Sequence, residues 1–157
     1  MKRKISILFI SVFIVSCGSL KNLRMFKDEI SVEKAIEKKE LMDKSDNPAF
    51  KYLITEELRE QLIKLEDVVV KDVTISGNID YDFCIIVSVP SKMGEVECYI
   101  YATGGFYSKE DVNTVSKLVR GETRIDAIGE FSRFFTLLDE TFTKIEIVKA
   151  KVDIKKS

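Results

Sequence analysis

The chain has 157 residues, which is enough for one domain, and its 45% hydrophobic and 32% charged residues are typical of a globular protein. It contains no His and no Trp, so the serine triad and His-based metal sites are excluded. Once Lys2, Arg3 and Lys4 are set aside, 22 basic residues face 26 acidic ones. This balance gives no general attraction for polyanions and disfavours nucleic acid as a partner.

The first seventeen residues have the composition of an export signal. Lys2 to Lys4 are positively charged, and residues 5–15 form an apolar run broken only by two serines. Eleven residues of helix are too short to span about 30 Å of hydrocarbon, but they have the length of a signal-peptide core. The run ends in Ile14-Val15-Ser16-Cys17.

This ending resembles the bacterial lipobox, although Ile14 stands where the family usually has Leu. The resemblance implies that residues 1–16 are a cleaved signal peptide and that Cys17 carries a diacylglycerol. The acyl chains would then hold the protein on a membrane, in the cell envelope on the extracytoplasmic side. Gly18 follows the Cys where an Asp would favour inner-membrane retention, so the outer membrane is favoured if the source is Gram-negative. The alternative is an ordinary signal peptide with a coincidental Cys.

Residues 17–30 are predicted to be a lipidated tether, and residues 31–66 a helical segment. Ser31 is a candidate N-cap for a helix over 31–44, and residues 45–48 are predicted to be a turn or helix stop. A second helix is expected over 55–66, because Leu58, Leu62 and Leu65 recur at helical spacing.

From residue 67 onward the composition changes to that of β-strands. Three β-rich runs end at Gly or Pro, a helix is expected to start at Ser108 and stop at Gly121, and two more strands follow. The apolar phase changes within the last strand, which predicts a bulge near Ile147. The expected strands cover residues 68–76, 81–89, 95–103, 122–131 and 143–154. The positions expected in the core are Val73, Ile75, Ile85, Val87, Val96, Ile100, Val115, Leu118, Ile125, Ile145 and Val152.

This element order is that of an OB-fold. The stretch 118–131 (LVRGETRIDAIGEF) also resembles the helix-to-strand phrase of small OB domains in the tRNA-anticodon-binding-like group. We therefore expect a mainly β (α+β) domain over 67–157. It would be a small five-stranded OB-like barrel with a helix between strands three and four, preceded by N-terminal helices. The alternative is another small α+β sandwich with the same element order.

Cys84 and Cys98 lie on strands that are expected to form a hairpin. A register that pairs Val89 with Gly94 keeps one face apolar and puts Cys84 opposite Tyr99, so no disulfide can form. A slip of one residue would align the two cysteines, but it would mix charged and apolar side chains. The first register is therefore favoured. Two Cys without His also make a poor zinc site, so no metal site is expected.

Five residues are candidate ligand contacts. Tyr99 and Tyr101 are expected on the outer face of strand three, and Arg133, Phe134 and Phe135 in the connection between strands four and five. In an OB-fold both places are usual ligand sites, and aromatic or Arg side chains there can stack on bases or sugars. The alternative is that the tyrosines are ordinary strand residues under a covering segment, and that residues 132–138 extend a strand or close the barrel.

No catalytic residues or cofactor motif can be identified, so we expect no enzyme and no cofactor. The favoured interpretation is a membrane-anchored envelope lipoprotein that acts as a non-catalytic binding or assembly module, with an envelope protein or glycan as partner. The alternatives are a single-stranded nucleic-acid-binding OB domain and, with less support, an envelope hydrolase.

Overall fold

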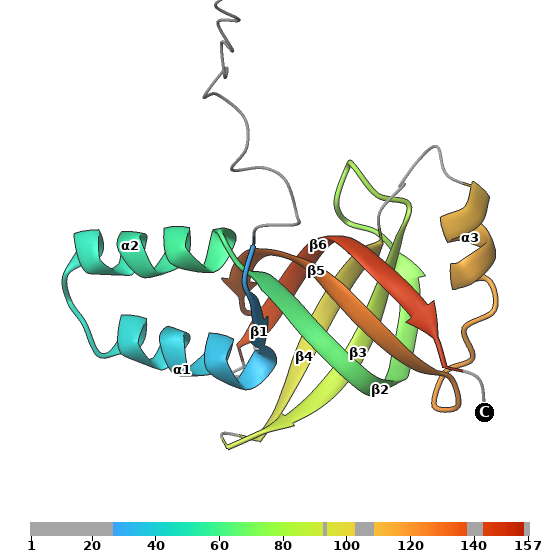
Figure 1. Ribbon diagram of the computed structural model, residues 1–157, viewed down its shortest axis with the longest axis horizontal. Helices are drawn as coiled ribbons and strands as arrows, with labels where there is room; N and C mark the ends of the chain where they lie inside the picture. Colours follow the sequence, from blue (N-terminus) through green and yellow to red (C-terminus); the bar gives the residue numbers. More distant parts are fainter. Residues whose placement is uncertain (1–26, 93, 103–108, 138–142, 156–157) are drawn as a thin grey trace, which may run out of the picture.

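The computed structural model describes residues 27–92, 94–102, 109–137 and 143–155 (Figure 1). Cys17, the signal peptide, most of the tether and the helix start expected at Ser108 lie outside these residues. Within the described part, none of the helices is long and apolar enough to cross a membrane. The elements are β1 (Glu29–Ser31), α1 (Val32–Asp43), α2 (Pro48–Arg59), β2 (Leu62–Ile75), β3 (Phe83–Ser91), β4 (Gly94–Ala102), α3 (Lys109–Val115), β5 (Arg124–Phe135) and β6 (Lys144–Ile154).

Five strands form a closed barrel in the order β2-β3-β4-β6-β5, and β2 pairs again with β5 to close it. The β4–β6 pair is parallel, and the other barrel pairs are antiparallel. The expected five-stranded OB-like barrel is thereby confirmed. The sequence did not predict β1, a short sixth strand that pairs in parallel with β2. Because of β1, α3 follows the fourth strand of the chain, which is the third strand of the barrel.

Bulges let the long strands bend around the barrel. Near Asp67, which has a φ of 53°, β2 shifts its register against β5, and Arg124 Nε donates to the Asp67 carboxylate at 2.7 Å. In β6 the extra residue is Lys149, with a φ of 50°. This second bulge lies close to the expected position, and it keeps both Ile147 and Ala150 buried although their spacing is odd.

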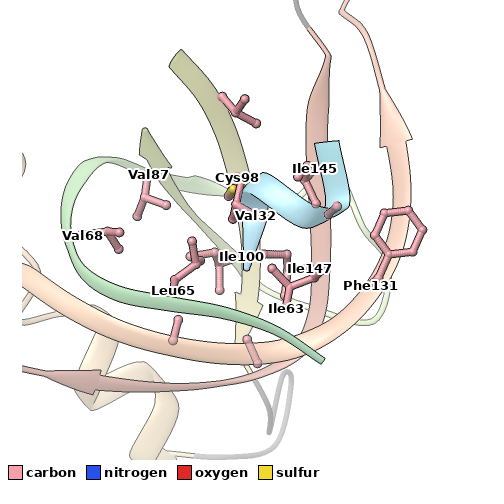
Figure 2. Packing of buried hydrophobic residues seen from close by; sticks show 14 of the residues in the cluster. Val32, Ile63, Leu65, Val68, Val87, Cys98, Ile100, Phe131, Ile145 and Ile147 are labelled. Atoms are coloured by element: carbon pink, nitrogen blue, oxygen red, sulfur yellow. The ribbon is translucent and has the colours of Figure 1, made fainter. Parts of the chain in front are cut away.

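The core fills the barrel and extends under the first helix. Figure 2 shows Val32 of α1 packed among side chains of the barrel strands, including Ile63, Ile100 and Ile147. Ile75 was expected in this core, but it is 86% exposed. Its position near the end of β2, paired with Phe83 where β3 begins, leaves no strand to cover it. The predicted core residues that are buried are Ile85, Val87, Val96, Ile100, Val115, Ile125 and Ile145, while Val73, Leu118 and Val152 are partly buried.

The predicted second helix is wrong in its bounds. The helix starts at Pro48, where the Asn47 side chain accepts the backbone N–H of Ala49 and caps the first turn. It ends at Arg59, and β2 begins at Leu62, so the expected boundary at residue 66 falls inside a strand. Residues 62–65 join the barrel because they pair with β5.

The β3–β4 hairpin has a register that differs by two residues from the one expected. Val89 pairs with Val96 and Val87 with Cys98. A shift of two residues preserves the faces, because side chains alternate along a strand. Cys84 and Cys98 therefore lie on opposite faces, and both are free thiols. Burial raises the pKa of each to about 12, which keeps the two thiols protonated.

Candidate ligand-binding face

The outer surface of β4, β5 and β6 gathers three of the five candidate side chains. Arg133 and Phe135 were expected in a connection, but they lie in the last residues of β5, which is longer than predicted. Inward-facing Cys98 and Ile100 alternate along β4 with outward-facing Tyr99. Tyr99 contacts Phe135 edge to face, with ring centroids 5.0 Å apart, and the Arg133 guanidinium lies 5.6 Å from the Phe135 ring. We call the surface formed by Tyr99, Phe135, Arg133, Glu97, Lys144 and Glu146 the outer face.

Arg133 is held in place by a buried carboxylate. Its Nε and Nη2 donate to Glu146 Oε2 at 3.0 and 2.9 Å, and the Ser132 hydroxyl donates to Glu146 Oε1 at 2.8 Å. The Glu146 side chain is 7% exposed, whereas that of Arg133 is 65% exposed. Both oxygens of the Glu146 carboxylate therefore accept hydrogen bonds from within the protein. Arg133 still presents much of its guanidinium to solvent.

A second cluster of charges lies beside Tyr99. Lys71 of β2 and Lys144 of β6 both donate to the Glu97 carboxylate. The Lys144 ammonium is buried and also lies 5.8 Å from the Tyr99 ring. Burial raises the pKa of Glu97, but the two lysines together outweigh it and hold that pKa below its usual 4.5. The carboxylate is thus ionised at neutral pH and anchors both cations.

Two candidates do not join the outer face. Tyr101 is only 6% exposed, because it packs against Tyr81 with ring centroids 5.3 Å apart. Burial, followed by the neighbouring Cys84 thiol, raises the pKa of Tyr101. Phe134 turns toward the core and packs against Phe131, with ring centroids 4.8 Å apart. For these two residues the alternative of a structural role describes the geometry better.

Sequence reasoning missed the charged partners of the face. Lys144 and Glu146 flank inward-facing Ile145 on β6, and Lys71 is the extra residue at a β2 register shift. Tyr81 was also missed, although its hydroxyl accepts the Lys149 backbone N–H at 3.0 Å and so fixes the loop between β2 and β3. Alternation along β6 could have assigned the face, but not the pairing across strands.

The outer face supplies two aromatic rings and the partly exposed guanidinium of Arg133. Beside them, two ammonium groups are paired with the Glu97 carboxylate. Such a surface can stack on a flat or ring-shaped ligand and hydrogen-bond its polar groups. Among the described residues, no group of three or more His, Cys, Asp or Glu side chains is arranged to hold a metal ion.

No protein-family model and no curated protein matches the chain. Solved structures whose folds are similar to that of this chain include the following three. The single-stranded DNA-binding protein of Plasmodium falciparum, in complex with single-stranded DNA, is 16% identical over 60% of this chain and 94% of its own (TM-score 0.36). The mitochondrial single-stranded DNA-binding protein Rim1 of S. cerevisiae is 11% identical over 60% of this chain and 92% of its own (TM-score 0.36). An OB domain from Methanosarcina mazei is 8% identical over 62% of this chain and 72% of its own (TM-score 0.32).

Two of these structures are of single-stranded DNA-binding proteins. The expectation that disfavoured nucleic acid as a partner is corrected by the distribution of charge on the outer face. That expectation relied on the net charge of the whole chain. Net charge averages over the surface and does not describe one face, and here Lys71, Lys144 and Arg133 lie together around two aromatic rings.

Proposed function

We propose that this protein is a non-catalytic binding module, anchored to a membrane by lipid on Cys17, whose OB-like barrel binds its ligand on the outer face. The observation that supports this most directly is the meeting of Tyr99, Phe135 and Arg133 from strands β4 and β5. The face lies on the third strand of the barrel and beside the connection of the last two, where OB-folds hold their ligands.

The first candidate ligand is an envelope glycan or protein segment. Lys144 and Arg133 of the outer face are matched by Glu97 and Glu146, and Lys71 beside the face adds one further positive charge. A face with so little net charge suits a ligand that is itself close to neutral and offers rings and hydroxyl or amide groups. An export signal would bring the barrel to the compartment where such ligands occur.

Single-stranded nucleic acid is a second candidate, favoured by the three cations that flank the aromatic pair. Bases can stack on aromatic rings with little regard to sequence while basic side chains contact phosphates. Lys71 and Arg133 are the exposed members of this group. If both contacted phosphates, the logarithm of affinity would fall with the logarithm of salt concentration with a slope of about −1.4.

The test compares the wild-type protein with a Tyr99→Ala/Arg133→Gln variant. Gln at 133 retains a donor for buried Glu146, and Tyr101 is left intact because its substitution would disturb packing. The matched control is Tyr52→Ala/Arg120→Ala, since both residues are exposed and Tyr52 lies on α2, away from the outer face. Both variants should keep the wild-type circular dichroism at the assay temperature. The face variant should melt at a lower temperature than the control, because buried Glu146 loses its charged partner.

Binding is measured by capture of partners from solubilised envelopes, by a glycan array and by titration with fluorescent oligonucleotides at two salt concentrations. We expect the wild type and the control to bind the same ligand and the face variant to lose at least about tenfold in affinity, as the loss of one good contact implies. Equal binding by the face variant would refute the outer face as the site. Salt-dependent oligonucleotide binding without glycan or partner capture would establish the second candidate.

A further inference from the structure

The α1–α2 hairpin presents apolar side chains that the barrel does not cover. Leu41 is 52% exposed, Phe50 39% and Leu53 65%. Figure 1 shows the two helices projecting from one end of the barrel, with α3 at the opposite end. The buried side chains Ile54 and Leu58 already join α2 to the core, so these three residues are not needed to hold the hairpin in place.

The three residues lie on one side of the hairpin. An ion pair of 2.7 Å between Lys38 and Glu57 joins the two helices on that side. Leu41 is three residues beyond Lys38 and Leu53 is four residues before Glu57, so each lies one turn nearer the connecting loop on the same side. Phe50 is a further three residues along α2. We call Leu41, Phe50 and Leu53 the hairpin patch.

The chain enters the described structure beside the end of α2. The Asp28 carbonyl accepts the Leu62 backbone N–H at 2.8 Å, and Lys27 Nζ donates to the Arg59 carbonyl at 3.1 Å. From Arg59 back to Phe50 is nine residues of helix, about 14 Å. From Cys17 to Lys27 is ten residues, which span at most about 35 Å when fully extended. A lipid on Cys17 would therefore keep the hairpin patch within reach of the bilayer surface.

We infer that the hairpin patch inserts into the bilayer that holds Cys17 and so fixes the orientation of the barrel; this rests on the proposed lipid anchoring. The occupant is the lipid surface itself, because the tether brings the patch to it at high effective concentration. Residues 32–60 contain six basic and eight acidic side chains. Insertion is therefore driven by apolar contact and does not require anionic lipid.

The chain contains no Trp, so a single introduced Trp reports its own surroundings. The experiment uses the full lipidated chain in phosphatidylcholine vesicles, with and without bromine on the acyl chains, and compares Phe50→Trp with the control Val119→Trp. Val119 is 49% exposed and lies four residues beyond α3, the helix that Figure 1 shows at the opposite end of the barrel from the hairpin. Flotation of the vesicles reports anchoring separately.

An interfacial side chain lies about 5–10 Å into the headgroup boundary, so bromolipid should remove about half of the emission of the Phe50→Trp protein and leave that of the Val119→Trp protein unchanged. Adding Leu41→Ser and Leu53→Ser to Phe50→Trp should abolish that quenching while flotation continues. Flotation with no quenching of the Phe50→Trp protein, or with equal quenching of both proteins, would overturn the inference but leave anchoring intact. A concentration-dependent blue shift of the Phe50→Trp emission without quenching would show self-association and also overturn it. Failure to float would contradict the proposed anchoring, and the inference with it.

Discussion

Charged side chains on the outer face are buried more deeply than their type usually allows. Lys144 is 4% and Glu146 is 5% exposed. Such charges are tolerated only when ion pairs and hydrogen bonds replace their hydration. Glu97 and Arg133 supply those partners from neighbouring strands. The same contacts therefore shape the candidate site and contribute to stability.

Replacing Glu97 by Gln should destabilise the fold at neutral pH by about 2 kcal/mol, because the ammonium groups of Lys71 and Lys144 lose a charged acceptor. The folded pKa of Glu97 lies below its usual 4.5, so its contribution is present above that pH and is lost as pH falls through the folded value. The free energy of urea unfolding, measured across a pH series from neutral into acid, should show the two proteins converging at the acid end.

Glu95→Gln is the control, since Glu95 is exposed and its carboxylate accepts a hydrogen bond from the Ser88 hydroxyl, which is a neutral donor that Gln can also satisfy. It should stay within about 0.5 kcal/mol of the wild type throughout. A Glu97→Gln difference that does not change with pH would contradict the assigned role.

At the scale of elements, local patterns predicted the strands and long-range pairing determined the exceptions. The runs that became β3 and β4 were evident from their β-branched residues and from the Gly and Pro that end them. Residues 62–65 carry Leu at helical spacing, and only their pairing with β5 reveals a strand. The start of α2 was missed because Pro48 was taken as a stop, although Pro is common in the first turn of a helix.

The same limit applies to the candidate site. The OB topology, inferred from element order, selected Tyr99, Arg133 and Phe135 as candidate ligand contacts, and in the structure Phe135 lies beside both of the others. Nothing in the local sequence shows that Tyr101 is covered by Tyr81 or that a register shift in β5 turns Phe134 inward. Those outcomes depend on which strands lie next to each other.

The register shift between β5 and β6 beside Gly129 predicts that stability is sensitive to a side chain at this position. A Cβ there would lie 2.6 Å from Ile147 Cγ2 and 2.9 Å from both the Ala150 Cβ and the Val148 carbonyl oxygen. Gly129→Ala should therefore cost about 1–3 kcal/mol through overpacking. Gly77→Ala, where a Cβ meets nothing within 4 Å, is the control and should change stability little. Equal melting temperatures for the two variants would show that β5 and β6 are not packed this closely.

At the scale of the whole molecule, the barrel separates two surfaces with different chemistry. The outer face offers aromatic rings and paired charges on β4, β5 and β6, and the α1–α2 hairpin offers exposed apolar side chains at one end. Lipid on Cys17 would place the hairpin end nearest the membrane. The central claim is that lipid on Cys17 attaches the protein to a membrane, because its location determines which ligands the barrel can meet.

That claim is tested most directly by detergent phase partitioning of the full chain and its Cys17→Ala variant, expressed in a bacterium that processes lipoproteins. Each acyl CH₂ contributes about 0.8 kcal/mol to partitioning when buried, so two or three chains dominate the behaviour of the protein. The account predicts that the wild type enters the detergent phase and incorporates labelled fatty acid, and that Cys17→Ala does neither. Equal partitioning of both proteins, with no label on the wild type, would contradict it.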